Sequence, residues 1–344
     1  MHTQRSQRWL AAVTLLTALA ALAGTGCRGN TSQQPEQATA LPEPTATPLP
    51  MNPRAVLVLP ADVNPTTAAD AQAVLAELAA GSGLEFETRP SLAANEMTAD
   101  IRVVVYLSQP NDLGSVAATA PQTQFIAISG EEWNPPGNVT VIHTREDQLG
   151  FLAGTLAAMI APNFRAGALF VTEQSSFNQP FINGVSYFCG TCNALIYPWV
   201  AYPLYSQQPS GSPAASWQNG FNEINALKVN VLYVPPEAAT AELGSFLAQQ
   251  DVALIGSQPP PEEARSRWAG TIQPDGLAVI REIWPDIING QGGRILNASF
   301  KVTDVQPITV QEGVVWASEG KLVLLNEIIN LLRDDLIYPF SIAP

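Results

Sequence analysis

The sequence predicts an α/β protein with two lobes, each built on a mostly parallel sheet. Short apolar runs of strand length alternate with segments of helical periodicity along most of the chain, which is the pattern of βαβ units. The 344 residues are enough for two ordinary domains. A helical segment at residues 144–160 and a buried strand at residues 166–171 lie between the two sets of strands. We interpret this helix as the element that closes the first lobe and leads into the second.

This central helix has two stripes on its surface. At its start, Thr144 stands three residues before Asp147, which indicates a helix start with an acidic residue where the helix dipole favours it. An apolar stripe at helical spacing is formed by Leu149, Leu152, Leu156 and Ile160. Gly150, Gly154 and Ala157 form a second stripe of small residues. Because a glycine inside a helix costs roughly 1 kcal/mol relative to alanine, the two glycines predict close packing against another backbone.

The first lobe is predicted to span residues 54–160. Strand-like runs are found at residues 55–59, 84–88, 101–106, 124–128 and 139–142, and the first is a continuous apolar run typical of a buried parallel strand. The second of these alternates apolar and polar residues, as an edge strand does. A long helix is predicted at residues 65–80, followed by Gly81 and Gly83, and a brief helix at residues 112–118.

The second lobe is predicted to span residues 161–300. Its strand-like runs are residues 166–171, 194–205, 229–234, 252–255, 268–272 and 298–302. Its predicted helices are residues 179–188, 215–227, 238–250 and one that ends at Asn289. Residues 301–344 are expected to return through the connection between the lobes and to end in a helix at residues 321–336 that packs across them.

The N-terminus has the order of a secretory signal peptide over residues 1–26. Arg5 and Arg8 precede an apolar run at residues 9–24, and small residues follow. The sequence LAGTGC around Cys27 resembles a bacterial lipoprotein signal, although Gly24 stands where a large apolar residue is usual. We favour lipidation of Cys27 after cleavage. The alternative is ordinary secretion, with Cys27 incidental.

Residues 27–53 are predicted to form an extended linker. They are rich in proline, threonine, glutamine and alanine and hold hardly any large apolar residue, so they bury too little surface to fold. A lipidated cysteine followed by such a linker would hold the folded part outside the cytoplasm, anchored to the cell membrane.

The composition excludes several classes of function. Acidic residues outnumber basic ones 30 to 16, for a net charge of −14, which argues against nucleic acid as a partner. Two histidines and three cysteines leave little material for a metal site or a histidine-dependent triad, and no G-x-S-x-G turn is present. We therefore expect a protein that is not an enzyme, uses no cofactor or metal, and is a monomer.

One short motif has two interpretations. Cys189-Gly190-Thr191-Cys192 has the spacing of a redox-active pair, which would be expected at a helix N-terminus, where the thiol pKa is lowered. Here the pair follows a predicted helix. Outside the cytoplasm a small structural disulfide is the other interpretation, and we favour it.

Four segments carry a resemblance to a known family. They read REDQLGFLAGTLAAMI, FNQPFINGVSYFCG, WQNGFNEINALKVNVLYVPP and WAGTIQPDGLAVIREIWPDIINGQ. In order and spacing they resemble segments of basic membrane protein (BMP) family lipoproteins, and the match covers most of residues 54–344. The resemblance implies the type I periplasmic-binding-protein fold, with two doubly wound parallel-sheet lobes joined by a hinge. It also implies a nucleoside-binding subunit of an ABC importer, with the ABC permease as partner.

Two loops depart from the family pattern. The segment at residues 61–70 lacks the aromatic residue of the family's Asp-x-Ser-Phe-Asn segment, and GSQPPP at residues 256–261 lacks the family's pair of aspartates. A carboxylate accepts hydrogen bonds from two ribose hydroxyls well, so these losses argue against nucleoside specificity.

The candidate ligand residues come from loops that follow the predicted strands, because ligands of open α/β sheets bind beyond the carboxyl ends of the strands. They are Asn64, Gln109, Ser129, Phe177, Gln179 and Gln258. Neutral amides and hydroxyls suit an uncharged polar ligand, such as a nucleoside or a sugar-like molecule, better than a phosphate or a strong cation. The ring of Phe177 would stack on the ligand; the alternative is a core aromatic that anchors the following helix.

We therefore predict a membrane-anchored solute-binding lipoprotein that closes over a small polar ligand and delivers it to an ABC importer. The alternative is a relative with a degenerate binding site, in which the same fold serves as a sensory or protein-interaction module.

Overall fold

The computed structural model describes residues 52–61, 63, 65–131, 133–193 and 197–341. The predicted signal peptide, Cys27 and nearly all of the predicted linker lie outside the described residues, as does Asn64. Within the described ranges, no helix combines the length and the apolar character needed to cross a bilayer.

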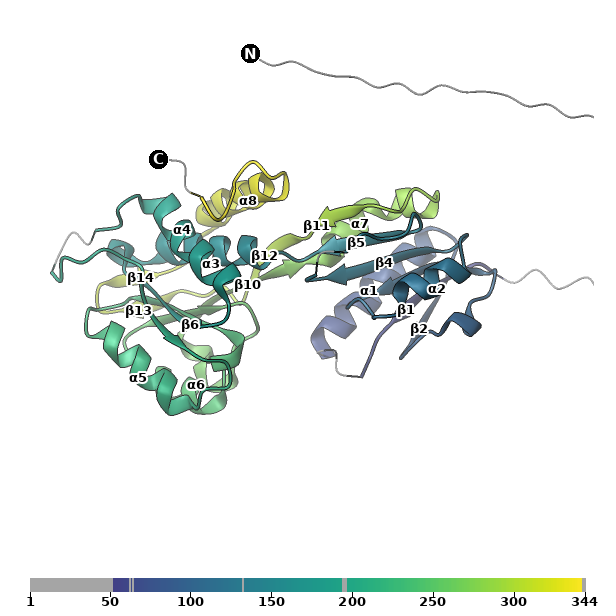
Figure 1. The fold of residues 1–344 in the computed structure, drawn as a ribbon. Helices are drawn as coiled ribbons and strands as arrows, with labels where there is room; N and C mark the ends of the chain where they lie inside the picture. The colour runs from purple at the N-terminus through teal and green to yellow at the C-terminus, as the bar shows by residue number, and fades with distance from the viewer. Residues whose placement is uncertain (1–51, 62, 64, 132, 194–196, 342–344) are drawn as a thin grey trace, which may run out of the picture. The chain divides into compact units, whose positions relative to one another are not determined.

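The first sheet, sheet A, has six strands in the order β11-β5-β4-β3-β1-β2, and all five neighbouring pairs are parallel (Figure 1). The strands are β1 (Arg54–Val58), β2 (Glu85–Arg89), β3 (Ile101–Tyr106), β4 (Gln124–Ser129), β5 (Val139–His143) and β11 (Ile295–Asn297). The apolar runs of β1, β3 and β4 are buried on both faces, and β2 lies at an edge. This agrees with the alternating pattern of the β2 sequence.

Helices cover both faces of sheet A. On one face, α1 (Pro65–Gly81) and α7 (Gly276–Ile288) pack over side chains of β1, β3, β4 and β5. The short helix α2 (Leu113–Thr119) covers the other face. The α1 and α7 helices are linked by an ion pair between Glu77 and Arg281, and the Trp284 indole donates a hydrogen bond to the hydroxyl of Ser82, the residue after α1 (2.9 Å).

The second sheet, sheet B, has the strand order β12-β10-β9-β8-β6-β7. Its strands are β6 (Ala166–Val171), β7 (Leu204–Gln208), β8 (Val231–Val234), β9 (Ala253–Gly256), β10 (Trp268–Asp275) and β12 (Ser299–Thr303). Every pair is parallel except β10 with β12, which is antiparallel. A separate two-stranded hairpin is formed by β13 (Ile308–Val310) and β14 (Gly313–Val315).

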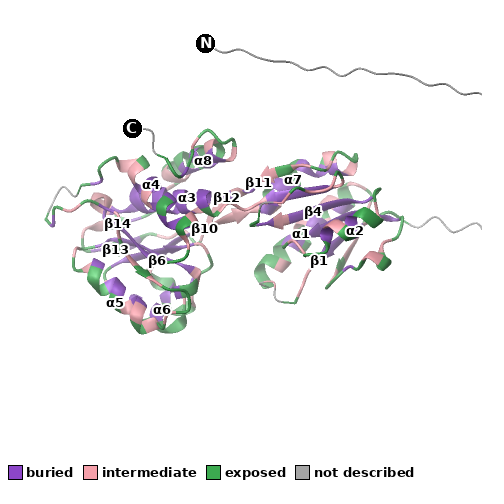
Figure 2. Cartoon of the chain, viewed as in Figure 1, coloured by how far each residue is buried: buried purple, intermediate pink, exposed green. Residues whose placement is uncertain are grey.

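Helices also cover both faces of sheet B, and the inner strands β6, β8 and β9 are buried throughout (Figure 2). One face packs against α3 (Glu146–Ile160), α4 (Ser175–Cys189) and α8 (Glu319–Arg333). The other packs against α5 (Ala214–Asn225) and α6 (Ala241–Leu247). The predicted fold class, two doubly wound α/β sheets, is confirmed.

The chain crosses between the two sheets three times. The crossings lie between β5 and α3, between β10 and α7, and between β11 and β12. As a result α3, which the sequence places at the end of the first lobe, packs on sheet B, whereas α7 and β11 return to sheet A. Periodicity shows which face of an element is buried, but it does not show which of two sheets covers that face.

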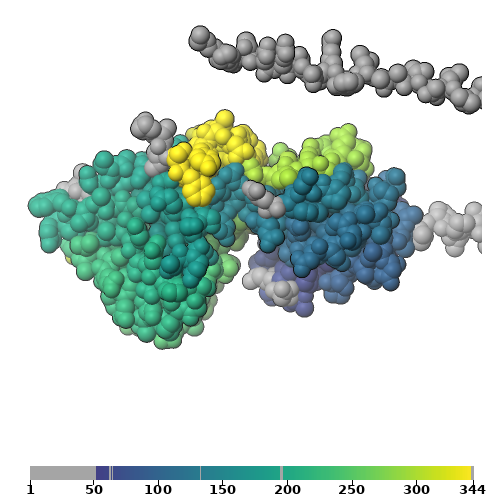
Figure 3. All heavy atoms as spheres, viewed as in Figure 1, coloured from purple at the N-terminus to yellow at the C-terminus, as the bar shows by residue number. Residues whose placement is uncertain are grey.

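The last helix, α8, lies at the surface against α3 (Figure 3). Its apolar residues Leu325, Ile328, Ile329 and Leu332 are buried in the same cluster as α3 and α4. From its C-terminal end, Arg333 reaches Glu282 of α7 at 3.3 Å. The predicted C-terminal helix therefore packs mainly on the helices of sheet B and contacts α7 only through its end.

The stripe of small residues on α3 faces α4. A Cβ added at Gly150 would overlap the Phe177 carbonyl oxygen, and one at Gly154 would overlap that of Phe181. The predicted close approach of another backbone is confirmed. The predicted cap is not: the helix begins at Glu146, and the Thr144 hydroxyl donates to the Ser129 carbonyl oxygen (3.2 Å).

Other differences are local. Helix α4 begins at Ser175, four residues before the prediction, and the predicted strand at residues 194–205 contributes only the first residues of β7. The predicted helix at residues 238–250 is a single 3-10 turn followed by the short α6. Strands β11, β13 and β14 were missed, because three-residue strands are too short to show alternation.

Candidate functional site

A cavity of about 400 Å³ lies between the carboxyl ends of strands from both sheets. The elements of sheet A contribute Thr66, Thr67 and Asp70 from α1, Leu107 after β3, Ile128 of β4, Thr144 after β5, and Gly276 and Leu277 of α7. The elements of sheet B contribute Gln258 and Pro259 after β9, Gln273, Pro274 and Asp275 of β10, and Lys301 of β12. This is the position at which open α/β sheets bind ligands.

Two antiparallel strands form one side of the cavity. Gln273 of β10 lies directly opposite Lys301 of β12, and Asp275 lies opposite Ser299. The Asp275 carboxylate also caps α7, because its Oδ1 accepts a hydrogen bond from the Ala278 N–H (3.2 Å). The strand that lines the cavity therefore also sets the start of the helix that returns to sheet A.

The crossing at Gly276 is tightly packed. A Cβ built at this glycine would lie 2.5 Å from the Ile128 Cδ1 atom of β4. Since real Cβ atoms do not approach this closely, a larger residue would require the Ile128 side chain or the crossing to shift. The sequence thus holds the end of β10 against the end of β4 at the edge of the cavity.

Eight of the fourteen described lining residues are polar, and they carry both signs of charge. Hydroxyls come from three threonines, amides from Gln258 and Gln273, and carboxylates from Asp70 and Asp275. The side chains of Lys301, Asp70, Gln258 and Gln273 make no hydrogen bond or ion pair with any described residue. Among the described lining residues none is aromatic.

Three of the residues predicted from the sequence lie at this edge. Gln258 lines the cavity. Ser129 follows the lining residue Ile128, but its hydroxyl accepts from the Glu131 N–H (3.1 Å) and donates to the Glu131 carbonyl oxygen (3.2 Å). Gln109 lies two residues after Leu107, and its Oε1 is buried without a hydrogen-bond partner among the described residues. Asn64 precedes α1 and is not described.

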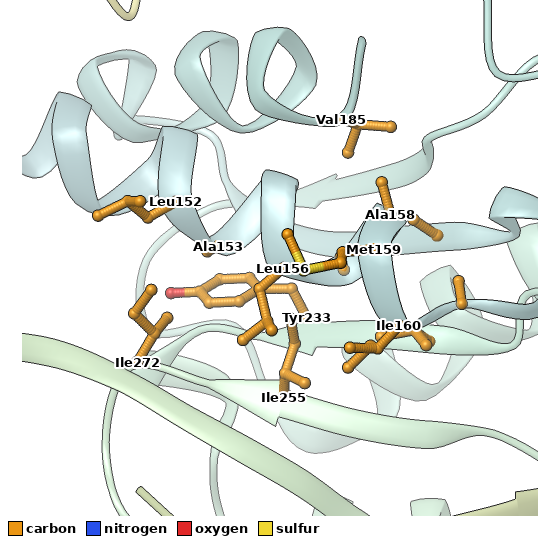
Figure 4. Close-up of a cluster of buried hydrophobic side chains, with 14 of the residues drawn as sticks. Leu152, Ala153, Leu156, Ala158, Met159, Ile160, Val185, Tyr233, Ile255 and Ile272 are labelled. Carbon is orange, nitrogen blue, oxygen red and sulfur yellow. The ribbon is translucent and has the colours of Figure 1, made fainter. Parts of the chain in front are cut away.

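The other two predicted residues lie on α4, away from the cavity lining. The Phe177 side chain is only 5% exposed, and its ring stacks on Tyr233 with 4.8 Å between centroids. Tyr233 itself lies beneath α3, near Leu152, Ala153 and Ile272 (Figure 4). Burial raises the pKa of Tyr233, whose hydroxyl contacts the Ser257 hydroxyl at 3.1 Å. Phe177 is therefore part of the core of sheet B.

Gln179 is exposed on α4, where its amide nitrogen donates to the Asn183 Oδ1 atom (3.0 Å). In turn, the Asn183 amide donates to the Pro339 carbonyl oxygen (2.8 Å). Gln179 thus belongs to a chain of contacts that holds the C-terminal segment against α4.

The sequence reasoning missed Lys301 and Gln273 as site residues. One signal was available in the sequence, since a lysine stands between the apolar residues Phe300 and Val302 of a predicted strand. In the structure Phe300 and Val302 pack in the core of sheet B, and Lys301 lines the cavity. The side chains of a strand alternate between its two faces, so this lysine lies on the opposite face from its apolar neighbours.

A second cavity, of about 380 Å³, has a different character. It is lined by Glu131, Trp133, Asn134, Val141, His143 and Ile295, all from the elements of sheet A. His143 already contacts the Gly130 carbonyl oxygen through Nε2 (3.3 Å). Because its walls come from one sheet only, movement between the sheets would not close this cavity.

The two described cysteines are joined. Cys189 ends α4, and its disulfide to Cys192 has a Cα–Cα distance of 5.0 Å. The pair thus lies at the C-terminal end of a helix, where the dipole does not lower a thiol pKa. A purely structural role stays a prediction. Within the described ranges no group of three or more His, Cys, Asp or Glu side chains could hold a metal ion.

Comparison with protein-family models and with curated proteins finds no match for this chain. Solved structures do match. An ABC transporter solute-binding protein from Conexibacter woesei DSM 14684 superposes with a TM-score of 0.58 at 17% identity, over 84% of this chain and 98% of that one. A transcriptional activator of the comK gene from Bacillus halodurans superposes with a TM-score of 0.54 at 11% identity, over 83% and 99%.

Identities this low show the fold alone. The chain has a type I periplasmic-binding-protein-like fold. Membership of the BMP family, which the sequence resemblance implies, stays a prediction.

Proposed function

We propose that this protein is an extracytoplasmic solute-binding protein that closes over a small polar molecule and delivers it to an ABC importer. The observation that carries the proposal is the cavity itself, whose walls come from the carboxyl ends of strands in both sheets. A ligand there contacts both sheets at once, so its binding favours the arrangement in which they approach each other.

The crossings support such a movement. Thr144 at the first crossing and Asp275 and Gly276 at the second line the cavity directly. Rotation about a few residues at the ends of elements is the usual form of hinge closure around a ligand. A small change at these crossings would therefore change the width of the cavity.

The ligand is expected to be small and polar. A cavity of about 400 Å³ is near the lower end of the usual range for ligand sites. The sequence resemblance implies a nucleoside, whereas the absence of an aromatic ring among the described lining residues gives a base no surface on which to stack. Hydroxyls, amides and charges favour a ligand recognised through hydrogen bonds.

Anchoring forms the second part of the proposal. Cleavage before Cys27 and lipidation there would tether the folded part to the outer side of the cell membrane through residues 28–53. A tether of this kind keeps a solute-binding protein at a high local concentration near its permease.

The test is ligand-induced stabilisation with a panel of nucleosides, bases, sugars and amino acids. A ligand at a hundred times its dissociation constant stabilises the folded state by about 2.7 kcal/mol. Gln258→Trp should fill the cavity and so abolish the rise in melting temperature that the ligand causes. The melting temperature of the ligand-free protein should stay unchanged. Gln179→Trp is the matched control, because Gln179 is exposed on α4, outside the cavity lining.

Two results would contradict the proposal. If no class of ligand shifts the melting of the wild type, the importer function fails, and the sensory or protein-interaction alternative takes its place. If Gln179→Trp abolishes the shift and Gln258→Trp does not, the protein binds its ligand outside this cavity.

A further inference from the structure

Among the described residues that line the cavity, Lys301 is the one basic side chain. The chain has 30 acidic and 16 basic residues, and only three of the basic residues are lysines. Most of the described arginines pair with a carboxylate within 4.0 Å: Arg54, Arg89, Arg145, Arg165, Arg265, Arg267, Arg281, Arg294 and Arg333. Like Arg102, Lys228 and Lys321, Lys301 pairs with no carboxylate of a described residue, although Asp70 and Asp275 line the same cavity.

Gln273 stands beside this ammonium group. The two residues are directly opposite on neighbouring strands, which places their Cβ atoms about 4.5–5.5 Å apart. Both side chains line the cavity and end in hydrogen-bond donors. Two adjacent donors, one of them charged, match the two oxygens of a carboxylate, and hydrogen bonds to ionised groups are the strong ones.

Asp70 supplies the opposite charge from α1. Its carboxylate makes no hydrogen bond or ion pair with any described residue, whereas the Asp275 carboxylate is already used by the N-terminus of α7. An ionised carboxylate only accepts hydrogen bonds. The free acceptor on the sheet A side therefore suits an ammonium group, just as the free donors on the sheet B side suit a carboxylate.

Closure of the cavity restricts which ligands fit these charges. A neutral sugar or nucleoside would leave Lys301 and Asp70 partly desolvated without partners, which costs free energy. A phosphate would meet Lys301 but would also bring more negative charge toward Asp70 and Asp275. A small molecule with one carboxylate and one ammonium group compensates both free charges.

We infer that the ligand of this cavity is a small zwitterion of the amino-acid class. Its carboxylate binds the Lys301 ammonium and the Gln273 amide, and its ammonium group faces Asp70. This inference rests on the proposed function, since it names the ligand class of the same site. It also explains why the ligand loops need no carboxylate pair for ribose hydroxyls.

The test is titration calorimetry on the purified folded protein with the standard amino acids, first as a mixture and then singly. The amino acid that binds is then compared with its carboxamide and with its N-acetylated form. Lys301→Gln should weaken binding of the amino acid at least tenfold, equivalent to about 1.4 kcal/mol. It should have little effect on whatever residual binding the carboxamide shows.

Asp70→Asn should weaken binding of the amino acid but not of its N-acetylated form. Lys228→Gln is the matched control, because Lys228 is exposed, lies outside the cavity lining and carries the same charge. This control should bind as the wild type does. Thermal melting of each free variant shows that the folded state is kept.

The outcomes separate the inference from the proposed function. If a nucleoside or a sugar binds and Lys301→Gln leaves its affinity unchanged, the inference of a zwitterionic ligand is wrong and the solute-binding function is kept. If a carboxylic acid without the amine binds as tightly as the amino acid, and Asp70→Asn does not change its affinity, Asp70 has no role in binding. The inference of a zwitterionic ligand is then wrong. No binding from any class overturns both proposals.

Discussion

Phe177 illustrates at the scale of one residue how a loop after a strand can serve either packing or recognition. The residue follows β6 at the start of α4, where a ligand-facing ring would also be expected. Its ring is buried instead, stacked on Tyr233 and packed beside Phe181. The sequence offers both alternatives because a single aromatic residue at a helix start carries no periodicity that shows which side it faces.

Truncation of this ring should affect stability and spare binding. We expect Phe177→Ala to lower the free energy of unfolding by roughly 3–5 kcal/mol, because the change leaves a cavity in the core of sheet B. Ligand affinity per folded molecule should be unchanged. Urea unfolding measures the first quantity and calorimetry the second.

The matched control is Phe340→Ala. Phe340 is 43% exposed near the C-terminus, and its truncation should change stability by no more than about 0.5 kcal/mol. Weaker binding by Phe177→Ala with unchanged unfolding would instead show that the ring meets the ligand.

Among the polar residues of the site, one was predicted from the sequence and another was missed. Gln258 was predicted because it follows a strand at the carboxyl edge, and it lines the cavity. Lys301 was missed because the sequence alone does not show that β12 pairs antiparallel with the end of β10. A pairing between segments that are distant in the chain depends on tertiary structure, so the charges of the site could not be assembled from the sequence.

At the scale of elements, the α3 and α4 pair shows what local pattern does predict. The two glycines of α3 indicated a close neighbour, and the structure identifies it as α4. The contact is reciprocal, since a Cβ at Gly184 of α4 would overlap the Phe151 carbonyl oxygen of α3. Small residues on both helices therefore bring the two backbones into direct contact.

We expect Gly154→Ala to destabilise the protein. Alanine favours a helix by roughly 1 kcal/mol over glycine, but the added methyl group would meet the Phe181 carbonyl oxygen. Overpacking of this kind typically costs about 1–3 kcal/mol, and here the clashing group is backbone. The net effect should be a lower melting temperature.

Gly320→Ala in α8 is the control, because no atom lies within 4 Å of the added Cβ. This variant should melt at or above the wild-type temperature through helix propensity alone. If Gly154→Ala melts as high as Gly320→Ala, the helices can separate without cost and the close contact is not required for folding.

The prediction of elements succeeded where burial is continuous. Strands β3 and β6 were predicted at their observed bounds, because parallel strands buried on both faces read as nearly continuous apolar runs, interrupted in β3 only by Arg102. The lobe to which α3 and α7 belong was not predictable, since each helix follows a strand of one sheet and packs on the other. Only the long-range strand pairings decide that assignment.

At the scale of the whole molecule, the folded part must be connected to the membrane if it serves an importer. The segment that would do so, Cys27 and residues 28–53, lies almost wholly outside the described residues, so its role rests on sequence. We expect the mature protein extracted from membranes to begin at Cys27 and to carry acyl chains. Intact-mass measurement checks this.

Cys27→Ala should leave the membrane fraction or keep its signal peptide, because the acceptor sulfur is gone. Recovery of this variant from the membrane with unchanged mass and amount would show that anchoring does not depend on Cys27.

The three crossings make a further property of the whole molecule testable. The Ala298 N–H donates to the His143 carbonyl oxygen (2.8 Å), which joins the first crossing to the third. The end of α8 holds the same region, because its Leu332 carbonyl oxygen accepts from Gln148 (2.8 Å) and its Arg333 carbonyl oxygen accepts from Asn297 (3.2 Å). The first and third crossings are therefore bonded to each other and held by the end of α8, which favours movement of each sheet with its helices as a unit.

We expect ligand to change distances between the sheets and not within them. Spin labels at Gln122→Cys beside sheet A and Glu242→Cys on α6 should show a ligand-dependent shift in their distance distribution, measured by pulsed electron paramagnetic resonance. Labels at Glu223→Cys on α5 and Glu242→Cys on α6 lie on the same face of sheet B and should show none. Because closure is rotation about the crossings, the first pair must respond whenever the cavity is occupied. A bound ligand, verified by calorimetry on the same labelled sample, that leaves both distributions unchanged would mean that the protein binds without closing.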